Sequence, residues 1–223
     1  MVNLTRIYTR TGDAGKTRLS DMSETDKTDP RVAAYGDVDE ANSALGLALA
    51  TGELDDEITA VLRHIQNEMF DLGADLSNPL IAEPEFEPLR IIPESITRLE
   101  QWCDHFTAPL PKLRSFILPG GTLAAAHLHL ARTLTRRAER SAWHAVHTYG
   151  TEEGTGDDPG GVNLAAVTYL NRLSDLLFIL TRAVNGTDSE TLWVPGGERS
   201  APRAESATRQ EPSTPPDDQE SQA

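Results

Sequence analysis

Apolar residues recur at steps of three and four along much of this chain, the spacing that places them on one face of an α-helix. The clearest run has six such positions: Ile58, Val61, Ile65, Met69, Leu72 and Leu76. A run in the last third shows the same alternation: Ala166, Leu170, Leu173, Leu177, Leu180 and Val184. Seams of this kind are typical of helices that pack in a bundle.

Capping and turn residues divide the pattern into five helices. Pro30 suits a helical start and Gly52 a stop, so the first helix is predicted between them. Asp55 or Asp56 can cap a second helix, which ends before Pro79. The other three helices are predicted over residues 93–106, 123–149 and 163–184. Because no stretch is convincing as a strand, the sequence predicts an all-α fold, a five-helix up-and-down bundle.

Three regions follow from this pattern. Residues 1–29 are polar and form an N-terminal segment, residues 30–194 form the bundle, and residues 195–223 are predicted to be a disordered polar tail because they lack periodicity. Residues 79–92 are a proline-rich connection. Residues 150–161 resemble a phosphate loop only superficially, because their four acidic residues would repel phosphate, and we interpret them as a flexible turn.

The length, net charge and cysteine count of the chain narrow the classes of partner. The chain has 223 residues and a formal net charge of −15, which argues against nucleic acid or an anionic membrane as a partner. Cys103 is the only cysteine, so no intrachain disulfide can form. Arg6 and Arg10 are not followed by an apolar run, so no signal peptide is expected, and no apolar stretch reaches about 18 residues. These features predict a soluble cytoplasmic protein without a membrane span.

Arginines gather on one face of the fourth predicted helix. Arg132, Arg136 and Arg140 lie at i, i+4 and i+8 and cover roughly 12 Å, about the reach of a polyphosphate. Glu139 follows Arg136 by three residues and can orient it. A solvated basic face is the alternative. We favour an anion site because a strongly acidic chain concentrates four arginines here, with Arg137 as the fourth.

The N-terminal segment carries a second phosphate-type signal. Gly12 and Gly15 permit positive φ and close backbone approach, and three threonines nearby can donate hydrogen bonds. Four basic residues against one acidic residue give a local charge of +3, from Arg6, Arg10, Lys16 and Arg18 with Asp13. The segment is therefore either an anion-binding nest or a disordered arm. It is not a Walker A loop, because that spacing and the preceding strand are absent.

Other polar groups in the predicted helices leave several interpretations open. The carboxylates of Asp37, Asp39 and Glu40 could be solvated, bind metal, or pair with arginines across a contact between subunits, which would favour a homo-oligomer. The fifth helix carries polar groups that need partners or serve a ligand: Asn171, Arg172, Ser174 and Asp175. The histidines of the fourth helix lack the spacing and carboxylate partners of a metal site, so no metal ligand is assigned.

Four blocks of sequence, taken together, closely resemble the PduO-type ATP:cob(I)alamin adenosyltransferases. They are TRTGDAGKT at 9–17, YGDVDEANS at 35–43, FILPGG at 116–121 with ARTLTRRAER at 131–140, and YLNRLSD at 169–175. The resemblance covers about residues 5–186. It implies a homotrimer of five-helix bundles with active sites between neighbouring subunits. It also implies transfer of the 5'-deoxyadenosyl group of ATP to cob(I)alamin, with release of triphosphate and with Mg²⁺ as cofactor.

The resemblance also implies roles for individual residues. The nucleotide contacts it implies are Thr9, Arg10, Thr11, Gly12, Asp13, Gly15, Lys16, Thr17, Arg18, Lys27, Arg136, Arg137, Glu139, Arg140 and Asn171. Asp39 and Arg132 are expected to pair across the subunit boundary and, with Arg136 and Glu139, to support catalysis. Phe116 is expected under the corrin, where it displaces the lower axial ligand of cobalt, with Asp175 as a further cobalamin contact. Trp193 is a candidate for closing the corrin pocket.

Two departures from the family pattern and two rival functions remain open. The 150–161 loop is longer than the usual connection between the fourth and fifth helices, and the chain beyond Pro195 is unmatched. One rival is an adenosylcobalamin carrier or chaperone, and the other is a nucleotide-binding helical bundle that takes no corrinoid. A cobalt reductase and an adenosylcobalamin-dependent client enzyme are the partners that the resemblance implies beyond ATP and cobalamin.

Overall fold

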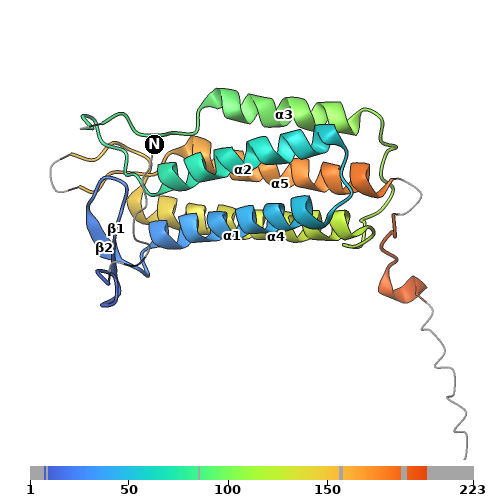
Figure 1. Ribbon diagram of the computed structural model, residues 1–223, viewed down its shortest axis with the longest axis horizontal. Helices are drawn as coiled ribbons and strands as arrows, with labels where there is room; N and C mark the ends of the chain where they lie inside the picture. Colours follow the sequence, from blue (N-terminus) through green and yellow to red (C-terminus); the bar gives the residue numbers. More distant parts are fainter. Residues whose placement is uncertain (1–7, 9, 85, 156–157, 187–189, 200–223) are drawn as a thin grey trace, which may run out of the picture. The chain divides into compact units, whose positions relative to one another are not determined.

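Five helices make up the bundle (Figure 1). The computed structural model describes residues 8, 10–84, 86–155, 158–186 and 190–199. The helices are α1 (Pro30–Thr51), α2 (Asp56–Leu76), α3 (Pro93–Thr107), α4 (Leu123–Tyr149) and α5 (Leu164–Asn185). Each predicted helix is present, and its ends agree with the prediction to within two residues. The all-α, five-helix bundle is therefore confirmed.

Side-chain caps explain why the helix starts could be predicted. Asp29 accepts a hydrogen bond from the Arg31 amide at the start of α1, and Asp55 accepts one from the Ile58 amide at the start of α2. Thr122 and Asn163 cap α4 and α5 in the same way, whereas α3 begins at Pro93 without a side-chain cap. These caps satisfy amides that the first turn of a helix leaves unpaired.

The α1 and α4 helices pack against each other more extensively than any other pair in the described chain. Both carry buried alanines every seventh residue, all at most 2% exposed: Ala34, Ala41 and Ala48 on α1, and Ala124, Ala131, Ala138 and Ala145 on α4. A seven-residue repeat keeps one stripe facing the partner helix, and small side chains let the two backbones approach closely. The α4 helix also packs on α5, which contacts α3 as well.

Two buried carboxylates hold the bundle together, Asp75 at a connection and Glu68 between α2 and α5. Asp75 pairs with Arg90 at 2.7 Å and accepts hydrogen bonds from the Ile91 amide and the Asn163 side chain, both at 2.7 Å. Glu68 accepts from Tyr169 at 2.9 Å. The Asp75 cluster fixes the 77–92 connection to the start of α5, so the proline-rich segment is held although it lacks helix or strand over most of its length.

Two short strands correct the prediction that the chain has none. Strands β1 (Lys16–Arg18) and β2 (Glu24–Asp26) pair antiparallel, with Thr17 opposite Thr25. Each strand has only three residues and no alternation of apolar and polar side chains, so the hydrophobic pattern of the sequence did not reveal them. The hairpin reverses where Met22 adopts a φ of 70°.

The 150–161 loop is held in place rather than being a flexible turn, as far as its described residues 150–155 and 158–161 show. The Gly154 amide donates to the Leu80 carbonyl at 2.8 Å, and the Leu80 amide donates to the Gly161 carbonyl at 3.0 Å. Gly160 has a φ of 77°, and a Cβ there would lie 2.0 Å from the Leu80 carbonyl oxygen. Only glycine fits this approach, so the glycines give close packing here rather than flexibility.

The C-terminal tail and the α5 helix bear on two of the earlier expectations. Residues 194–199 belong to a unit separate from the bundle, and Gly196–Glu198 within it form a 3₁₀ turn. The rest of the predicted disordered tail, residues 200–223, lies outside the described residues. By length and composition alone, the α5 helix could cross a membrane, but 56% of its most apolar stretch is buried in the protein. Such burial is typical of the core helix of a bundle.

We predict that Asp75→Ala lowers the free energy of unfolding by about 3–5 kcal/mol, because it leaves the Arg90 guanidinium partly buried without its carboxylate. Urea denaturation followed by circular dichroism measures the change. Asp104→Ala, at an exposed position on α3, is the matched control and should stay within about 0.5 kcal/mol of the wild type. Equal stabilities of the two variants would contradict this assignment.

Candidate active site

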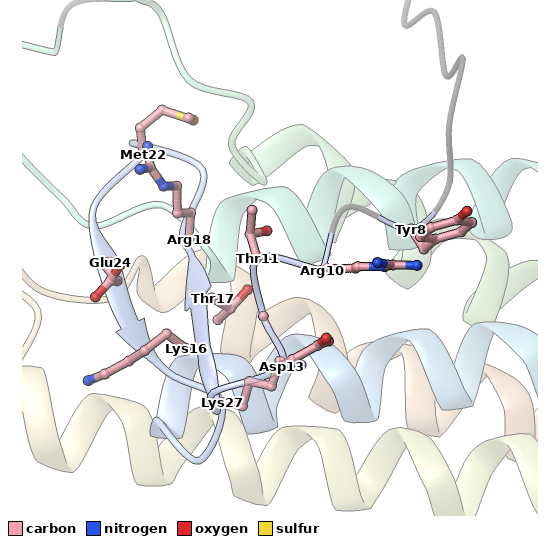
Figure 2. A pocket seen from close by; sticks show the side chains of 11 residues that line it. Tyr8, Arg10, Thr11, Asp13, Lys16, Thr17, Arg18, Met22, Glu24 and Lys27 are labelled. Carbon is pink, nitrogen blue, oxygen red and sulfur yellow. The ribbon is translucent and has the colours of Figure 1, made fainter.

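The N-terminal segment encloses an open cavity of about 900 Å³ (Figure 2). Four cationic and two acidic side chains line it, together with Tyr8, Thr11, Gly12, Thr17 and Met22; the charged ones are Arg10, Lys16, Arg18, Lys27, Asp13 and Glu24. The lining therefore has a net charge of about +2 in a strongly acidic chain, which favours an anionic ligand. Figure 2 shows Thr11, Thr17 and Asp13 around the space between loop and hairpin.

Backbone conformation shapes this cavity as the two glycines predicted. Gly15 has a φ of 82°, and its carbonyl accepts from the Lys27 amide at 2.8 Å. A Cβ on Gly12 would lie 3.1 Å from the Lys27 Nζ, so glycine leaves room for that ammonium group. Thr9, which was also predicted to bind ATP, lies outside the described residues.

Two of the cations that line the cavity already have protein partners: Lys16 forms a salt bridge, and Arg10 contacts an aromatic ring. Lys16 pairs with Asp26 across the hairpin at 2.8 Å, and this hydrogen bond, with the charge of Asp26, raises the pKa of Lys16. The Arg10 guanidinium lies 5.7 Å from the centre of the Tyr8 ring, and in Figure 2 it extends away from the hairpin. Lys27 and Arg18 form no ion pair among the described residues, so they face the cavity with less competition from protein carboxylates.

The arginine face of α4 is present as predicted. The Arg136 and Arg140 side chains are exposed, and Arg140 donates to the Arg136 carbonyl at 3.1 Å. Arg132 is half-buried, and its Nε has no hydrogen-bond partner among the described residues. Burial, and then the nearby charge of Arg136, lower the pKa of Arg132. A row of three guanidinium groups with no carboxylate bonded to it is suited to an incoming polyanion.

Arg137, the fourth arginine, has a different environment. It forms ion pairs with two carboxylates of α1, Asp37 at 3.2 Å and Glu40. Asp37 also accepts a hydrogen bond from Ser141 at 2.6 Å. The structure thus uses Arg137 and Asp37 to join α4 to α1 within one chain, while Asp39 on the same helix is exposed.

A chain of polar side chains crosses from α4 to α3. Asn171 donates to Glu139 at 3.2 Å, and its carbonyl oxygen accepts from Arg172 at 3.0 Å. Arg172 also donates to Glu100 at 2.8 Å. The structure therefore brings Glu139 and Asn171 together, although they lie 32 residues apart, as a shared nucleotide site requires.

Aromatic rings form an exposed apolar surface at the end of the bundle where α4 begins. Phe116 is 80% exposed and meets Trp193 edge-to-face, with 6.3 Å between ring centres. The Trp193 amide donates to the Phe116 carbonyl at 2.7 Å, and the Leu118 amide donates to the Thr191 carbonyl at 2.9 Å. Phe116 is therefore exposed rather than part of the core, and Trp193, the candidate for closing the corrin pocket, is its neighbour.

Asp175 does not lie with these aromatic rings among the described contacts. It is exposed on α5 and close to Cys103 on α3, and after burial its charge is the main cause that raises the pKa of Cys103 to about 11. The cobalamin contact expected for Asp175 therefore stays a prediction.

Within one chain the predicted site residues form three separate groups. The cavity of the N-terminal segment has no α4 arginine in its lining, and the segment docks at the start of α1, where Thr17 hydrogen-bonds Tyr35. Arg136 lies at the middle of the 27-residue α4, roughly 20 Å from either end, and Phe116 precedes its first turn. The described residues contain no cluster of three or more His, Cys, Asp or Glu side chains that could hold a metal ion.

Comparison with known proteins places this arrangement in a family. Residues 7–184 match the family described as cobalamin adenosyltransferase. The corrinoid adenosyltransferase of Mycobacterium tuberculosis is 58% identical over 200 residues, which is 90% of this chain and 98% of that protein. The corrinoid adenosyltransferase of Bacillus subtilis is 43% identical over 183 residues, covering 81% and 86% of the two chains.

Solved structures agree with the sequence matches. A variant PduO-type ATP:corrinoid adenosyltransferase from Lactobacillus reuteri, complexed with cobalamin and ATP, aligns with a TM-score of 0.72 at 36% identity. The alignment covers 84% of this chain and 96% of that one. The span of the family match, the identities and the shared five-helix fold together show that this chain belongs to the cobalamin adenosyltransferase family.

Proposed function

We propose that the protein transfers the 5'-deoxyadenosyl group of ATP to the cobalt of cob(I)alamin. The exposed arginine row of α4, beside the Glu139–Asn171 pair, is the observation that carries this proposal. The Lactobacillus reuteri relative, solved with cobalamin and ATP, supports the choice of both substrates. Cobalt(I) attacks C5' with its electron pair, a Co–C bond forms, the C5'–O bond breaks, and triphosphate leaves with the bonding electrons.

This chemistry asks the protein for positioning and charge stabilisation rather than for a nucleophile, because cobalt(I) is itself the nucleophile. Negative charge grows on the triphosphate as the C5'–O bond breaks. Arg136 and Arg140 on α4, with Lys27 of the N-terminal segment, are suited to stabilise that charge. Glu139, held by Asn171, is suited to orient the ribose or a metal bound to the nucleotide.

Mg²⁺ fits this site as an ion carried by the nucleotide. No cluster of three or more metal-ligating side chains is found in the described part of the chain, but Mg²⁺ commonly takes one or two carboxylates and binds mainly to phosphate oxygens. Glu139 lies between Arg136 and Arg140 in the sequence of α4 and would supply that contact. When bound, Mg²⁺ neutralises part of the triphosphate charge.

Phe116 and Trp193 form the surface that suits the corrin. Their rings are exposed and in contact, which favours a large apolar ligand over water. A phenyl ring beneath cobalt cannot act as a ligand, so it would displace the lower axial ligand. Loss of that ligand makes cobalt(II) easier to reduce to the nucleophilic cobalt(I).

A homotrimer with sites between subunits would bring the three groups together. Arg136 does not line the N-terminal cavity of its own chain, so a neighbouring subunit would supply the second half of the site. Arg132 has an unpartnered buried Nε, and Asp39 is an exposed carboxylate without a described ion pair, so the two are complementary across such a contact. We therefore propose Asp39–Arg132 as an intersubunit pair.

The cellular setting follows from the same chemistry. A reductase must supply the electron that makes cobalt(I), and an adenosylcobalamin-dependent enzyme would receive the product. A cytoplasmic location suits such a pathway. In the proposed enzyme, residues 1–29 serve as the nucleotide-binding segment and residues 30–194 as the catalytic bundle.

Arg136→Ala should lower turnover by about 10²–10³, because it removes a cation from the developing triphosphate charge. Adenosylcobalamin formation from ATP and chemically reduced cobalamin is measured by absorbance, and circular dichroism verifies that the helix content is unchanged. Arg63→Ala, at an exposed position on α2, is the matched control and should retain wild-type turnover. Unchanged turnover in Arg136→Ala would place the triphosphate elsewhere.

Phe116→Ala should slow the reaction that starts from cob(II)alamin and a reductant by roughly tenfold more than the reaction that starts from cob(I)alamin, since only the first needs the shift in cobalt potential. Both rates are measured with saturating ATP. Phe86→Ala removes a ring of similar exposure, 79%, from the 77–92 connection and should affect neither route. Equal slowing of both routes by Phe116→Ala would remove this role.

Charge reversal tests the proposed intersubunit pair. Asp39→Arg should weaken the trimer, because it places two cations together, and adding Arg132→Asp should restore part of the assembly. Light scattering coupled to gel filtration measures the mass, and Asp104→Arg on α3 is the control for an added positive charge. A trimer that is equally stable in all variants would show that the two residues do not meet.

A further inference from the structure

Asp29 lies where the β1–β2 hairpin, α1 and α4 meet, and its carboxylate receives three short hydrogen bonds. The Arg31 amide donates to Oδ1 at 2.7 Å. The hydroxyls of Thr25 on β2 and Tyr149 in the last turn of α4 both donate to Oδ2 at 2.6 Å. One oxygen therefore joins the nucleotide-binding hairpin to the far end of the helix that carries the arginine row.

Arg31 extends the same cluster to the 150–161 loop. Its guanidinium lies 4.4 Å from the centre of the Tyr149 ring, and the residue is 1% exposed. Its Nη2 donates to the carbonyls of Gly160 at 2.5 Å and Gly161 at 3.1 Å. Tyr149 is thus fixed on its ring face by Arg31 and at its hydroxyl by Asp29.

The charge on Asp29 is maintained by these donors. Burial alone would raise the pKa of Asp29, but the hydrogen bonds from Thr25, Tyr149 and the Arg31 amide outweigh it and lower the pKa. Burial and the bond to Asp29 raise the pKa of Tyr149 to about 12, so its hydroxyl keeps its proton and remains a donor near neutral pH. Both hydrogen bonds on Oδ2 are therefore charge-assisted, the stronger class.

Capping of α1 accounts for only part of this arrangement. An N-cap needs one acceptor for an amide of the first turn, and Oδ1 meets that need. The bonds on Oδ2 come from segments 4 and 120 residues away in sequence and add nothing to the cap itself. They fix instead where the hairpin lies against the bundle.

The hairpin carries side chains assigned above to ATP, and Thr25 is at their centre. Thr25 pairs directly with Thr17 in the ladder, and Lys16 pairs with Asp26 next to it. Lys27 lies midway between Thr25 and Asp29, and its amide bonds the Gly15 carbonyl. A shift of Thr25 would therefore move Lys27, Thr17 and the glycine turn together.

We propose that Asp29 is a positioning residue for ATP, which holds the hairpin through Thr25 and Tyr149 on a single carboxylate oxygen. Asp29 does not itself touch the nucleotide in this proposal. It sets the place of the hairpin cations relative to the bundle before ATP binds, and the inference rests on the proposed adenosyl transfer from ATP.

The test removes the donor hydroxyl of each residue while it largely keeps the shape of the side chain. Thr25→Val and Tyr149→Phe, made in the full chain, should each raise the KM for ATP about tenfold, the size expected for one lost charge-assisted hydrogen bond, while the KM for cob(I)alamin changes by less than about twofold. The double variant should lose less than the product of the two single effects, because both bonds share one oxygen. Thr25→Ser keeps the hydroxyl and should restore the wild-type KM for ATP.

Thr97→Val is the matched control. It removes a threonine hydroxyl that bonds only the Pro93 carbonyl within α3, at 3.1 Å, and both KM values should stay unchanged. An equal rise in both KM values together with a lower melting temperature would show a purely structural role, and unchanged KM values would also overturn the proposal. Calorimetric titration with ATP measures nucleotide binding independently of adenosyl transfer. If the wild type bound ATP but formed no adenosylcobalamin, the proposed reaction would be wrong, and the ATP affinities of the variants would still test the positioning role of Asp29.

Discussion

The close contact between α1 and α4 is the constraint on which the arrangement of the site depends. Alanines at every seventh position bury the same stripe of α4 along its whole length, so the rotation of this helix about its axis is fixed. Arg136 and Arg140 are then directed to solvent, while Arg137, adjacent to Ala138 of the stripe, meets the carboxylates of α1. The rotation of α4 thus divides four neighbouring arginines into one that pairs with α1 and a row that is proposed to bind an anion.

The bundle also separates tasks along its length. The N-terminal cavity lies where α1 begins, the arginine row lies at the middle of α4, and the aromatic pair lies where α4 starts. Rigid helices maintain these separations, which is the reason for proposing that a neighbouring subunit completes the site. A family defined by transfer between two large substrates is consistent with such a division, since each substrate can meet a different subunit.

Much of this fold could be predicted because its signals are local. Apolar periodicity, Pro30, and the caps at Asp55 and Asn163 act within a few residues of the feature they determine. The arginine row followed from helical spacing alone. The resemblance of four short blocks added the chemistry, which periodicity could not supply.

What could not be predicted depends on contacts with the backbone or between distant segments. The end of the connection between α4 and α5 is held by the carbonyls of Gly160 and Gly161, which accept from Arg31, and a sequence pattern shows side chains rather than the carbonyls they meet. The hairpin strands are too short and too polar for periodicity to show. The engagement of Arg137 by Asp37 depends on how α4 is rotated against α1, and the position of Phe116 depends on backbone hydrogen bonds with residues 191–193.

Asn185, at the end of α5, has a consequence for the spacing of the two substrates. Its side chain accepts from the Thr122 amide at 2.8 Å and donates to the Gly120 carbonyl at 3.1 Å, which ties the segment after Phe116 to the last turn of this helix. Asn171 lies on the same helix, roughly 21 Å earlier. In the proposed site, α5 therefore fixes the spacing between Asn171, a nucleotide contact, and the segment that carries Phe116, and this spacing does not depend on the closing of a loop.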